Sequence, residues 1–162
     1  MLSPLNLLKI HVTHYAMSPQ TVTNRLQRVM NAAARVVSDT RKFDRGLKAI
    51  LHDELHWLYV PERIEYKLAV MVYRCLHGQA SRCLADHLIP ASDAALRLSR
   101  LRSAHRSCHI VPRCRLSTYG CRSFDYAAPT VWNSLPNELR NSDSFDGFKV
   151  KRFMKTILFS RC

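Results

Sequence analysis

The chain has 162 residues, of which 47% are apolar and 23% charged, with a formal net charge of +13 and a pI near 10.0. This composition argues against wholesale disorder, and the length fits one domain or one small domain with a tail. A balance this basic indicates a polyanionic partner, nucleic acid before membrane, with a basic surface that has no partner as the open alternative.

Residues 1–17 read as a divergent N-terminal segment. The apolar run in "MLSPLNLLKIHV" is too short for a signal peptide and is interrupted by Pro4. No window of the chain approaches the roughly 18 apolar residues of a membrane span. The six cysteines are therefore expected to be reduced thiols. We expect an intracellular protein, nuclear or cytoplasmic, without a membrane partner.

Residues 18–89 are expected to form a small helical domain, beginning with a helix over residues 18–38. Ser18 suits the N-cap, and Pro19 suits the first helical position. The apolar positions at helical spacing are Val22, Leu26, Val29, Met30, Ala33, Val36 and Val37. Arg25, Arg28 and Arg35 lie mostly off this stripe, either as solvated side chains of a core helix or as a nucleic-acid face.

Three more helices are expected before residue 90. Asp44 is placed to cap a short helix with apolar positions at Leu47, Ile50, Leu51 and Leu55. Pro61 opens the strongest helix, which ends at Gly78 and has its apolar stripe at Ile64, Leu68, Met71, Val72, Cys75 and Leu76. Ser81 is placed to cap a further short helix.

Residues 90–127 form a basic, irregular segment without sustained periodicity. Seven arginines occur from Arg97 to Arg122 with no acid among them. A connection this long and irregular is usually functional or disordered, and guanidinium groups bind phosphates as bidentate donors. The predicted nucleic-acid-binding residues are Arg97, Arg100, Arg102, Arg106, Arg113 and Arg115. Within the segment, "CHIVPRCRLSTYG" is expected to contribute one short extended piece.

Residues 128–162 are expected to form a Trp/Pro clasp followed by a C-terminal helix. Pro129 is placed to start a short helical turn through Trp132, and Pro136 another through Leu139. Ser142 or Asp143 is expected to cap the last helix, on which one face carries Phe153, Met154, Ile157 and Leu158. The predicted fold class is therefore mainly α: a small helical domain, an irregular Arg-rich segment and a short C-terminal helix.

Two clusters contain metal-ligand residue types. In "HDELH", His52 and His56 stand one helical turn apart, but Asp53 occupies the place of a zinc protease's glutamate, which favours a polar helix face. The second cluster comprises His105, Cys108, His109, Cys114 and Cys121. Its cysteines are separated by five and six residues, wider than in zinc knuckles, which favours incidental cysteines.

The sequence offers no set of catalytic residues. The four glycines stand alone, so there is no phosphate-binding loop, and none of the eight aspartates has an aspartate neighbour for a two-metal site. We expect no enzymatic activity, no cofactor and no metal. Aromatic residues near the basic segment either stack on unpaired bases or cover a small core: Tyr119, Phe124, Tyr126 and Trp132.

Four phrases together resemble one family: "LQRVMNAAARVV", "ELHWLYVPERIEYKLAVMVYRCLHG", "VPRCRLSTYG" and "PTVWNSLPNELRNSDSFDGFK". They are similar to the C-terminal, post-palm region of reverse transcriptases of non-LTR (LINE-type, jockey-like) retrotransposons, over roughly residues 18–161. The resemblance implies a thumb-like domain at residues 18–89 that grips template–primer or element RNA beside the rest of the enzyme. No position matches the family's catalytic aspartate pair, so it implies a non-catalytic fragment of an RNA-directed DNA polymerase.

Three hypotheses about function follow. The first is an RNA- or DNA-binding region that uses the arginines of residues 90–127. The second is a protein-interaction or structural helical module, because the apolar stripes of residues 22–37 and 64–76 are long for one small core. The third is a metal-dependent enzyme centred on His52 and His56.

Overall fold

The computed structural model describes residues 20–41, 43–92, 107–113, 123–140 and 147–161. Of these residues 67% are helical and none lies in a strand, which confirms the mainly α class and the C-terminal helix. The elements are α2 (Gln20–Val37), α3 (Leu47–Ala49), η1 (Ile50–Glu54), α4 (Val60–Leu76), α5 (Arg82–Ala85), α6 (Phe124–Ser134), α7 (Asn137–Arg140) and α8 (Gly147–Phe159).

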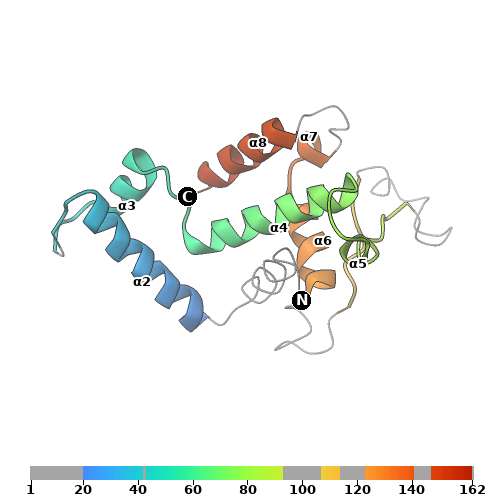
Figure 1. The fold of residues 1–162 in the computed structure, drawn as a ribbon, viewed down its shortest axis with the longest axis horizontal. Helices are drawn as coiled ribbons and strands as arrows, with labels where there is room; N and C mark the ends of the chain where they lie inside the picture. Colours follow the sequence, from blue (N-terminus) through green and yellow to red (C-terminus); the bar gives the residue numbers. More distant parts are fainter. Residues whose placement is uncertain (1–19, 42, 93–106, 114–122, 141–146, 162) are drawn as a thin grey trace.

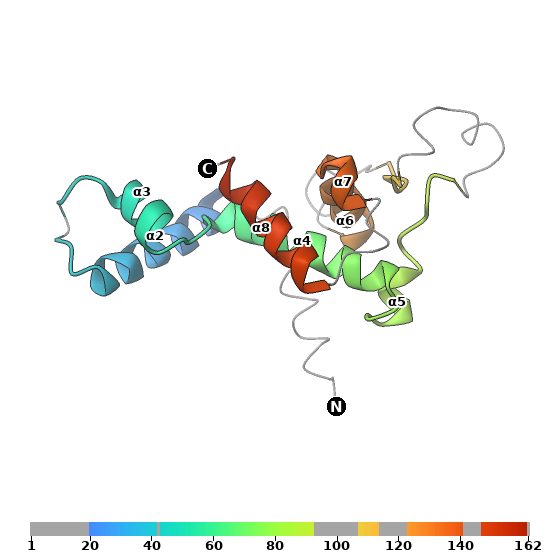
Figure 2. The same ribbon diagram turned by 90° about the horizontal axis from the view of Figure 1, so that it is seen from above.

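The central helix is α4, and other helices are arranged along it (Figure 1). Both α6 and α8 pack against α4, whereas α2 meets it near its first residue, where the Gln27 side chain accepts a hydrogen bond from the Val60 N–H at 2.9 Å. Figure 2 shows α2 and α3 at one end of the molecule and α5 at the other. Residues from both halves of the sequence therefore share one helical framework.

The core lies where α4 meets α6 and α8. Its buried members from α4 are Leu68, Ala69, Val72, Tyr73 and Cys75, and those from the C-terminal part include Phe124, Trp132, Leu139, Val150 and Met154. The predicted helix from Pro61 is confirmed, with the proline near its start and Glu62 in its first turn. The buried surface of α4 adds Ala69 and Tyr73 to the predicted stripe, because helices cover α4 from more than one side, whereas the predicted stripe residue Leu76 is 44% exposed.

The predicted start of a helix at Pro129 is wrong, because Pro129 lies inside α6, which begins at Phe124. An interior proline removes a backbone hydrogen bond and costs about 3 kcal/mol in an isolated helix. Tertiary packing offsets this cost, since Ala128 is fully buried and Trp132 is 1% exposed. The second predicted turn is confirmed as α7, whose residue Leu139 donates its N–H to the Pro136 carbonyl at 3.2 Å.

The last helix, α8, buries one face against the core and exposes the opposite one. Val150, Met154 and Leu158 are buried at a spacing of four residues. Phe153 is 48% exposed, so the prediction that it shares a face with Met154 is wrong. One residue turns a helix by about 100°, which carries Phe153 out of the contact with α4. The predicted caps Ser142 and Asp143 lie outside the described residues.

The first helix is confirmed as α2, but its apolar stripe is only partly covered. Ala34 is buried, whereas Val29, Val36 and Val37 are 67%, 83% and 63% exposed. The inner side of α2 meets α3, η1 and the first part of α4, and none of these described elements covers its outer side. The interpretation of α2 as a core helix therefore holds for its inner side only, because three of its valines are exposed.

The helix predicted after Asp44 divides into α3 and the π-helical turn η1. Asp44 does not cap it, because its carboxylate accepts the Arg41 N–H at 2.8 Å within the preceding turn. The N-cap position belongs to Gly46, whose φ of 98° suits glycine. The short helix expected after Ser81 is confirmed as α5. Among the helices described, none is long and apolar enough to cross a bilayer.

Two Val→Ala substitutions test where the core lies. Val72 of α4 is fully buried, whereas Val36 of α2 is 83% exposed. We expect Val72→Ala to lower the free energy of unfolding by about 2 kcal/mol through lost burial and a residual cavity, and Val36→Ala to change it by less than about 0.5 kcal/mol. Urea unfolding of the whole chain measures both. Equal effects of the two substitutions would contradict this core.

Candidate functional site

The predicted binding arginines fall mostly beyond the described structure. Arg113 is exposed at the end of the described segment 107–113. The remaining predicted residues, which lie outside the described residues, are Arg97, Arg100, Arg102, Arg106 and Arg115. Their role in binding nucleic acid stays a prediction.

The outer face of α8 gathers basic side chains around an exposed aromatic ring. Lys149, Arg152, Phe153 and Thr156 follow one another at helical spacing and line a shallow surface hollow of about 350 Å³ together with Glu138 of α7. Lys155 is also exposed on this helix. Because Val150 and Met154 hold the opposite face in the core, these cations are directed away from it. We call Lys149, Arg152, Phe153, Lys155 and Thr156 the α8 face.

The cations of the α8 face have no carboxylate within ion-pair distance among the described residues. Among the described residues, Arg161 is the one Lys or Arg within ion-pair distance of an acid. Its guanidinium lies 3.8 Å from the Glu65 carboxylate. Burial raises the pKa of Glu65, with the Arg161 charge opposing the shift. An exposed contact at this distance contributes little to stability. Within the described part of the chain, no carboxylate therefore neutralises the positive charge of the α8 face.

Cations that have no ion-pair partner among the described residues, beside an exposed ring, are suited to single-stranded nucleic acid. Lysine and arginine neutralise phosphates, and an aromatic face stacks on bases of any sequence. The sequence interpretation missed this face because it assigned Phe153 to the core. The signal that could have found it is the spacing of Lys149, Arg152 and Thr156, which places polar residues on the same side as Phe153.

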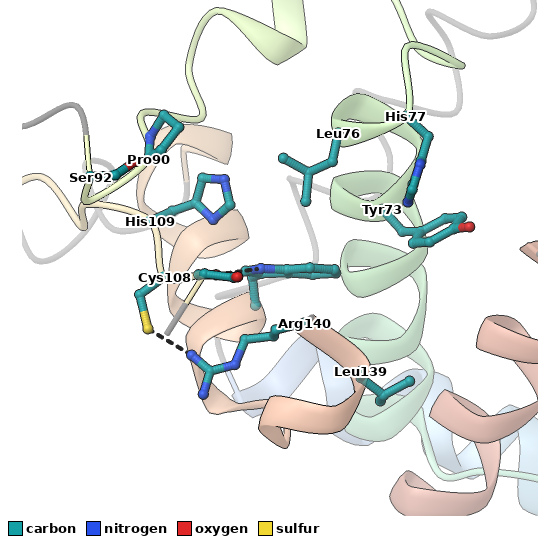
Figure 3. A pocket seen from close by; sticks show the side chains of 11 residues that line it. Tyr73, Leu76, His77, Pro90, Ser92, Cys108, His109, Leu139 and Arg140 are labelled. Atoms are coloured by element: carbon teal, nitrogen blue, oxygen red, sulfur yellow. Dashed lines mark hydrogen bonds between the residues drawn. The ribbon is translucent and has the colours of Figure 1, made fainter. Parts of the chain in front are cut away.

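A second feature is a cavity of about 350 Å³ at the C-terminal end of α4. Three separate parts of the chain line it: the end of α4, the paired segments around Pro90 and His109, and α6 with α7 (Figure 3). An isolated antiparallel bridge joins Pro90 to His109, with Ala91 N–H to Cys108 carbonyl and Ile110 N–H to Ile89 carbonyl bonds of 2.9 Å each. The predicted extended piece is thereby confirmed for residues 108–110.

Two residues of α6 fix the segment containing His109. The Trp132 indole N–H donates to the Ser107 carbonyl at 3.2 Å. Asn133 uses both ends of its amide: Oδ1 accepts the His109 N–H at 2.9 Å and Nδ2 donates to the His109 carbonyl at 2.8 Å. The Asn133 side chain thus pairs with the His109 backbone as a neighbouring strand would. The predicted Trp/Pro clasp therefore contacts the extended piece around His109.

His109 and Arg140 are the polar groups held at the cavity with unmet hydrogen bonds. His109 is 7% exposed, and neither ring nitrogen has a hydrogen-bond partner among the described residues. Burial lowers the pKa of His109, which favours the neutral ring. Arg140 donates to Cys108 Sγ at 2.7 Å and to the Asn137 side chain, while its buried Nε lacks a partner in the described part.

Of the two histidines of "HDELH", His52 lies within the π-helical turn η1 and His56 lies two residues beyond its end, so they do not share a regular helix face. His52 Nδ1 is 2.7 Å from an Asp53 carboxylate oxygen, and this hydrogen bond raises the pKa of His52. His56 has a φ of 49°, and its Nδ1 lies 3.0 Å from the His52 carbonyl oxygen. Across the described ranges, no three His, Cys, Asp or Glu residues are placed to hold a metal ion. His105, Cys114 and Cys121 fall outside those ranges.

Comparison with known proteins adds no assignment to this geometry. No family model, no curated protein and no solved structure matches the chain.

The lowered pKa of His109 gives a signed prediction for stability. Below the ordinary pKa of 6.5, the unfolded chain takes up a proton that the folded chain resists, so the free energy of unfolding falls as pH drops through this region towards the folded pKa. His52 acts in the opposite direction because its pKa is raised. We therefore expect the free energy of unfolding of His109→Leu to fall less than that of the wild type as the pH drops from 7 to 5. Urea unfolding between pH 5 and 7 measures it, and parallel curves for the two proteins would contradict the assignment.

Proposed function

We propose that this chain is a non-catalytic, post-palm region of a retrotransposon RNA-directed DNA polymerase that binds RNA or template–primer through basic residues. The observation that carries the binding part is the α8 face, where Lys149 and Arg152 share a hollow with the exposed ring of Phe153 and Lys155 is exposed on the same helix. None of these cations has a described carboxylate within ion-pair distance. The polymerase part comes from the sequence resemblance, and the rest of a reverse transcriptase is the corresponding protein partner. An intracellular location, nuclear or cytoplasmic, belongs to the same proposal.

The composition of the α8 face predicts that nucleic acid binds without sequence preference. Each lysine or arginine that contacts a phosphate releases condensed counterions, so affinity falls as salt concentration rises. The half-exposed ring of Phe153 adds stacking of about 1–3 kcal/mol per unpaired base. Glu138 at the edge of the hollow repels phosphate, which favours a strand that follows α8 rather than α7.

Neutralising the α8 face tests the proposal. We expect the triple substitution Lys149→Gln, Arg152→Gln and Lys155→Gln to weaken binding of a single-stranded RNA. Three lost phosphate contacts should reduce the slope of log K against log salt concentration by about 2. Fluorescence anisotropy with a labelled oligonucleotide between 50 and 200 mM salt measures the affinity and the slope.

A matched triple substitution provides the control. Arg41→Gln, Arg45→Gln and Lys48→Gln remove the same charge from exposed positions between α2 and η1. If both triple variants weaken binding equally, net charge alone accounts for the affinity and the α8 face is not the interface. The same assay tests the predicted arginines of residues 90–127 by alanine substitution of Arg97, Arg100, Arg102, Arg106, Arg113 and Arg115.

A second function, protein interaction, is favoured by the outer side of α2. Val29, Val36 and Val37 are exposed on a helix that contains no acidic residue from Gln20 to Val37 but carries Arg25, Arg28 and Arg35. An apolar surface bordered by cations is complementary to an amphipathic helix bearing carboxylates. A second copy of α2 would instead bring arginines together, so we propose an acidic helical segment of another polypeptide as the partner.

Sedimentation and an introduced negative charge test this second function. The chain alone should sediment as a monomer, because like charges oppose pairing of two α2 helices. An acidic amphipathic helical peptide should bind it, and Val36→Glu should weaken that binding by at least ten-fold through lost apolar burial and charge repulsion. Val111→Glu, at an exposed valine outside α2, serves as the matched control. A self-associating chain, or peptide binding that is insensitive to Val36→Glu, would refute the acidic partner.

A further inference from the structure

The imidazole ring of His52 joins η1 to the last residue of α8. Its Nδ1 lies 2.7 Å from an Asp53 carboxylate oxygen, and its Nε2 lies 3.3 Å from the Phe159 carbonyl oxygen. Asp53 belongs to η1, whereas Phe159 ends α8 and lies 107 residues beyond His52 in the chain. The His52 side chain is 38% exposed, so water and protons reach the ring without unfolding. One accessible imidazole therefore bridges two separate elements.

The two contacts of His52 call for a proton on each ring nitrogen. An ionised carboxylate and a carbonyl oxygen both accept hydrogen bonds, and neither donates one. A neutral imidazole carries a single N–H, so it can bond to Asp53 or to Phe159 but not to both. The imidazolium ion carries two N–H groups and satisfies both acceptors at once. This arrangement of acceptors therefore favours the protonated ring.

The surroundings of His52 also favour the cation. The Phe159 carbonyl stands at the C-terminal end of α8, where helix carbonyls lack intrahelical partners and the macrodipole is negative. The Phe159 ring lies 4.4 Å from the His52 ring between centroids, within the range at which an aromatic ring attracts a cation. The hydrogen bond with Asp53 and then that with Phe159 raise the pKa of His52, whereas burial opposes the shift.

Among the described residues, Asp53 is the one charged group that acts on the pKa of His52. The other charged or titratable groups on η1 and on the elements around it are Glu54, His56, Lys48 of α3, the three arginines of α2, and Lys155 and Arg161 near the end of α8. None of these is a cause of the shift. The protonation of His52 therefore depends on its two hydrogen-bond partners.

His52 lies where the corner formed by α2, α3 and η1 meets the end of α8. Figures 1 and 2 both show the C-terminal end of α8 nearer to α3 than its other end. Residues 55–59, which connect η1 to α4, are not helical, and His56 among them has a φ of 49°. Hinges are commonly short connections of this kind. A contact between His52 and Phe159 therefore helps to hold the corner against α8.

We propose that His52 is a pH-sensitive latch, which fastens the end of α8 to η1 when the ring is protonated and releases it when the ring is neutral. The neutral ring keeps its N–H on Nδ1, because a hydrogen bond to the Asp53 carboxylate is charge-assisted and stronger than one to a carbonyl. The bare Nε2 then faces the Phe159 carbonyl oxygen with no proton between them. The latch does not rest on the proposed function, since it concerns how α8 is held and not what α8 binds.

The direction of the pH dependence follows from the raised pKa of His52. The stabilisation by the latch is fully present below the ordinary value of 6.5 and is lost as the pH rises through the folded-state pKa. The end of α8 is therefore held more firmly in acid than at alkaline pH.

An NMR titration of the full chain between pH 5 and 8.5 tests the latch. The ring signals of His52 report its protonation, and the carbonyl carbon signal of Phe159 reports the hydrogen bond. We expect His52 to titrate above its ordinary pKa of 6.5, and the Phe159 signal to change with the same midpoint. Asp53→Asn should lower both midpoints together, because it removes the charge and the carboxylate acceptor.

Hydrogen exchange at the end of α8 measures the release itself. The Ser160 N–H donates to the Thr156 carbonyl at 3.0 Å, so its protection reports the last turn. In the wild type, the protection factor should be about two- to five-fold higher at pH 5.5 than at pH 8, the effect of a cation at an exposed helix C-terminus. In His52→Gln, which removes the titrating ring, the protection factor and the Phe159 carbonyl signal should no longer depend on pH in this range.

His56→Gln is the matched control, because the His56 ring also lies beside Phe159, at 5.9 Å between centroids. This variant should keep the midpoint of the Phe159 carbonyl signal. A His52 midpoint at or below 6.5, a Phe159 signal that does not follow His52, or unchanged midpoints in Asp53→Asn would each overturn the latch. A pH dependence that survives in His52→Gln but disappears in His56→Gln would assign the titration to His56 and overturn it as well.

Discussion

The burial of Trp132 between α4 and the segment around His109 is the contact on which the described structure depends. An 11-residue helix with an internal proline, such as α6, is too short to be stable alone in water, so packing must supply its stability. Trp132 provides that packing at 1% exposure, and its indole N–H reaches the Ser107 carbonyl. The next residue, Asn133, then satisfies both backbone groups of His109. One helical turn therefore joins the core of α4 to an extended piece that lies some 25 residues earlier in the chain.

The same core contact determines how α8 presents its charge. Because Val150, Met154 and Leu158 must face α4, the rotation of α8 about its axis is fixed, and Lys149 and Arg152 can only point outwards. Neighbouring like charges on one helix face are destabilising by a few tenths of a kcal/mol per pair. Under the proposed function, a bound phosphate backbone would relieve that repulsion. Core packing and the outward position of these cations are thus two consequences of one amphipathic pattern.

Local patterns predicted the helices, and long-range packing decided where those predictions failed. The 3.6-residue period located α2, α4 and α8 because it depends on near neighbours. The rule that proline starts a helix failed at Pro129, because Ala128 and Trp132 pack too well for the helix to begin later. In α8 the apolar residues cover a wide arc, so the sequence could not say whether Met154 or Phe153 would face the core. Beside the cavity, the Asn133 side chain hydrogen-bonds the backbone of His109. No local sequence pattern encodes this contact.

Three features of the described chain leave groups with unmet interactions. His109 keeps two ring nitrogens without described partners, the α8 face keeps cations without described carboxylates in ion-pair distance, and α2 keeps three exposed valines. The proposed phosphate contacts on α8 and the proposed apolar partner on α2 would each relieve one of these costs. His109 differs, because its ring nitrogens are buried and no external group reaches them in this structure. Burial lowers the pKa of His109 and so keeps the ring neutral, which limits the cost of its missing partners to that of an uncharged polar group.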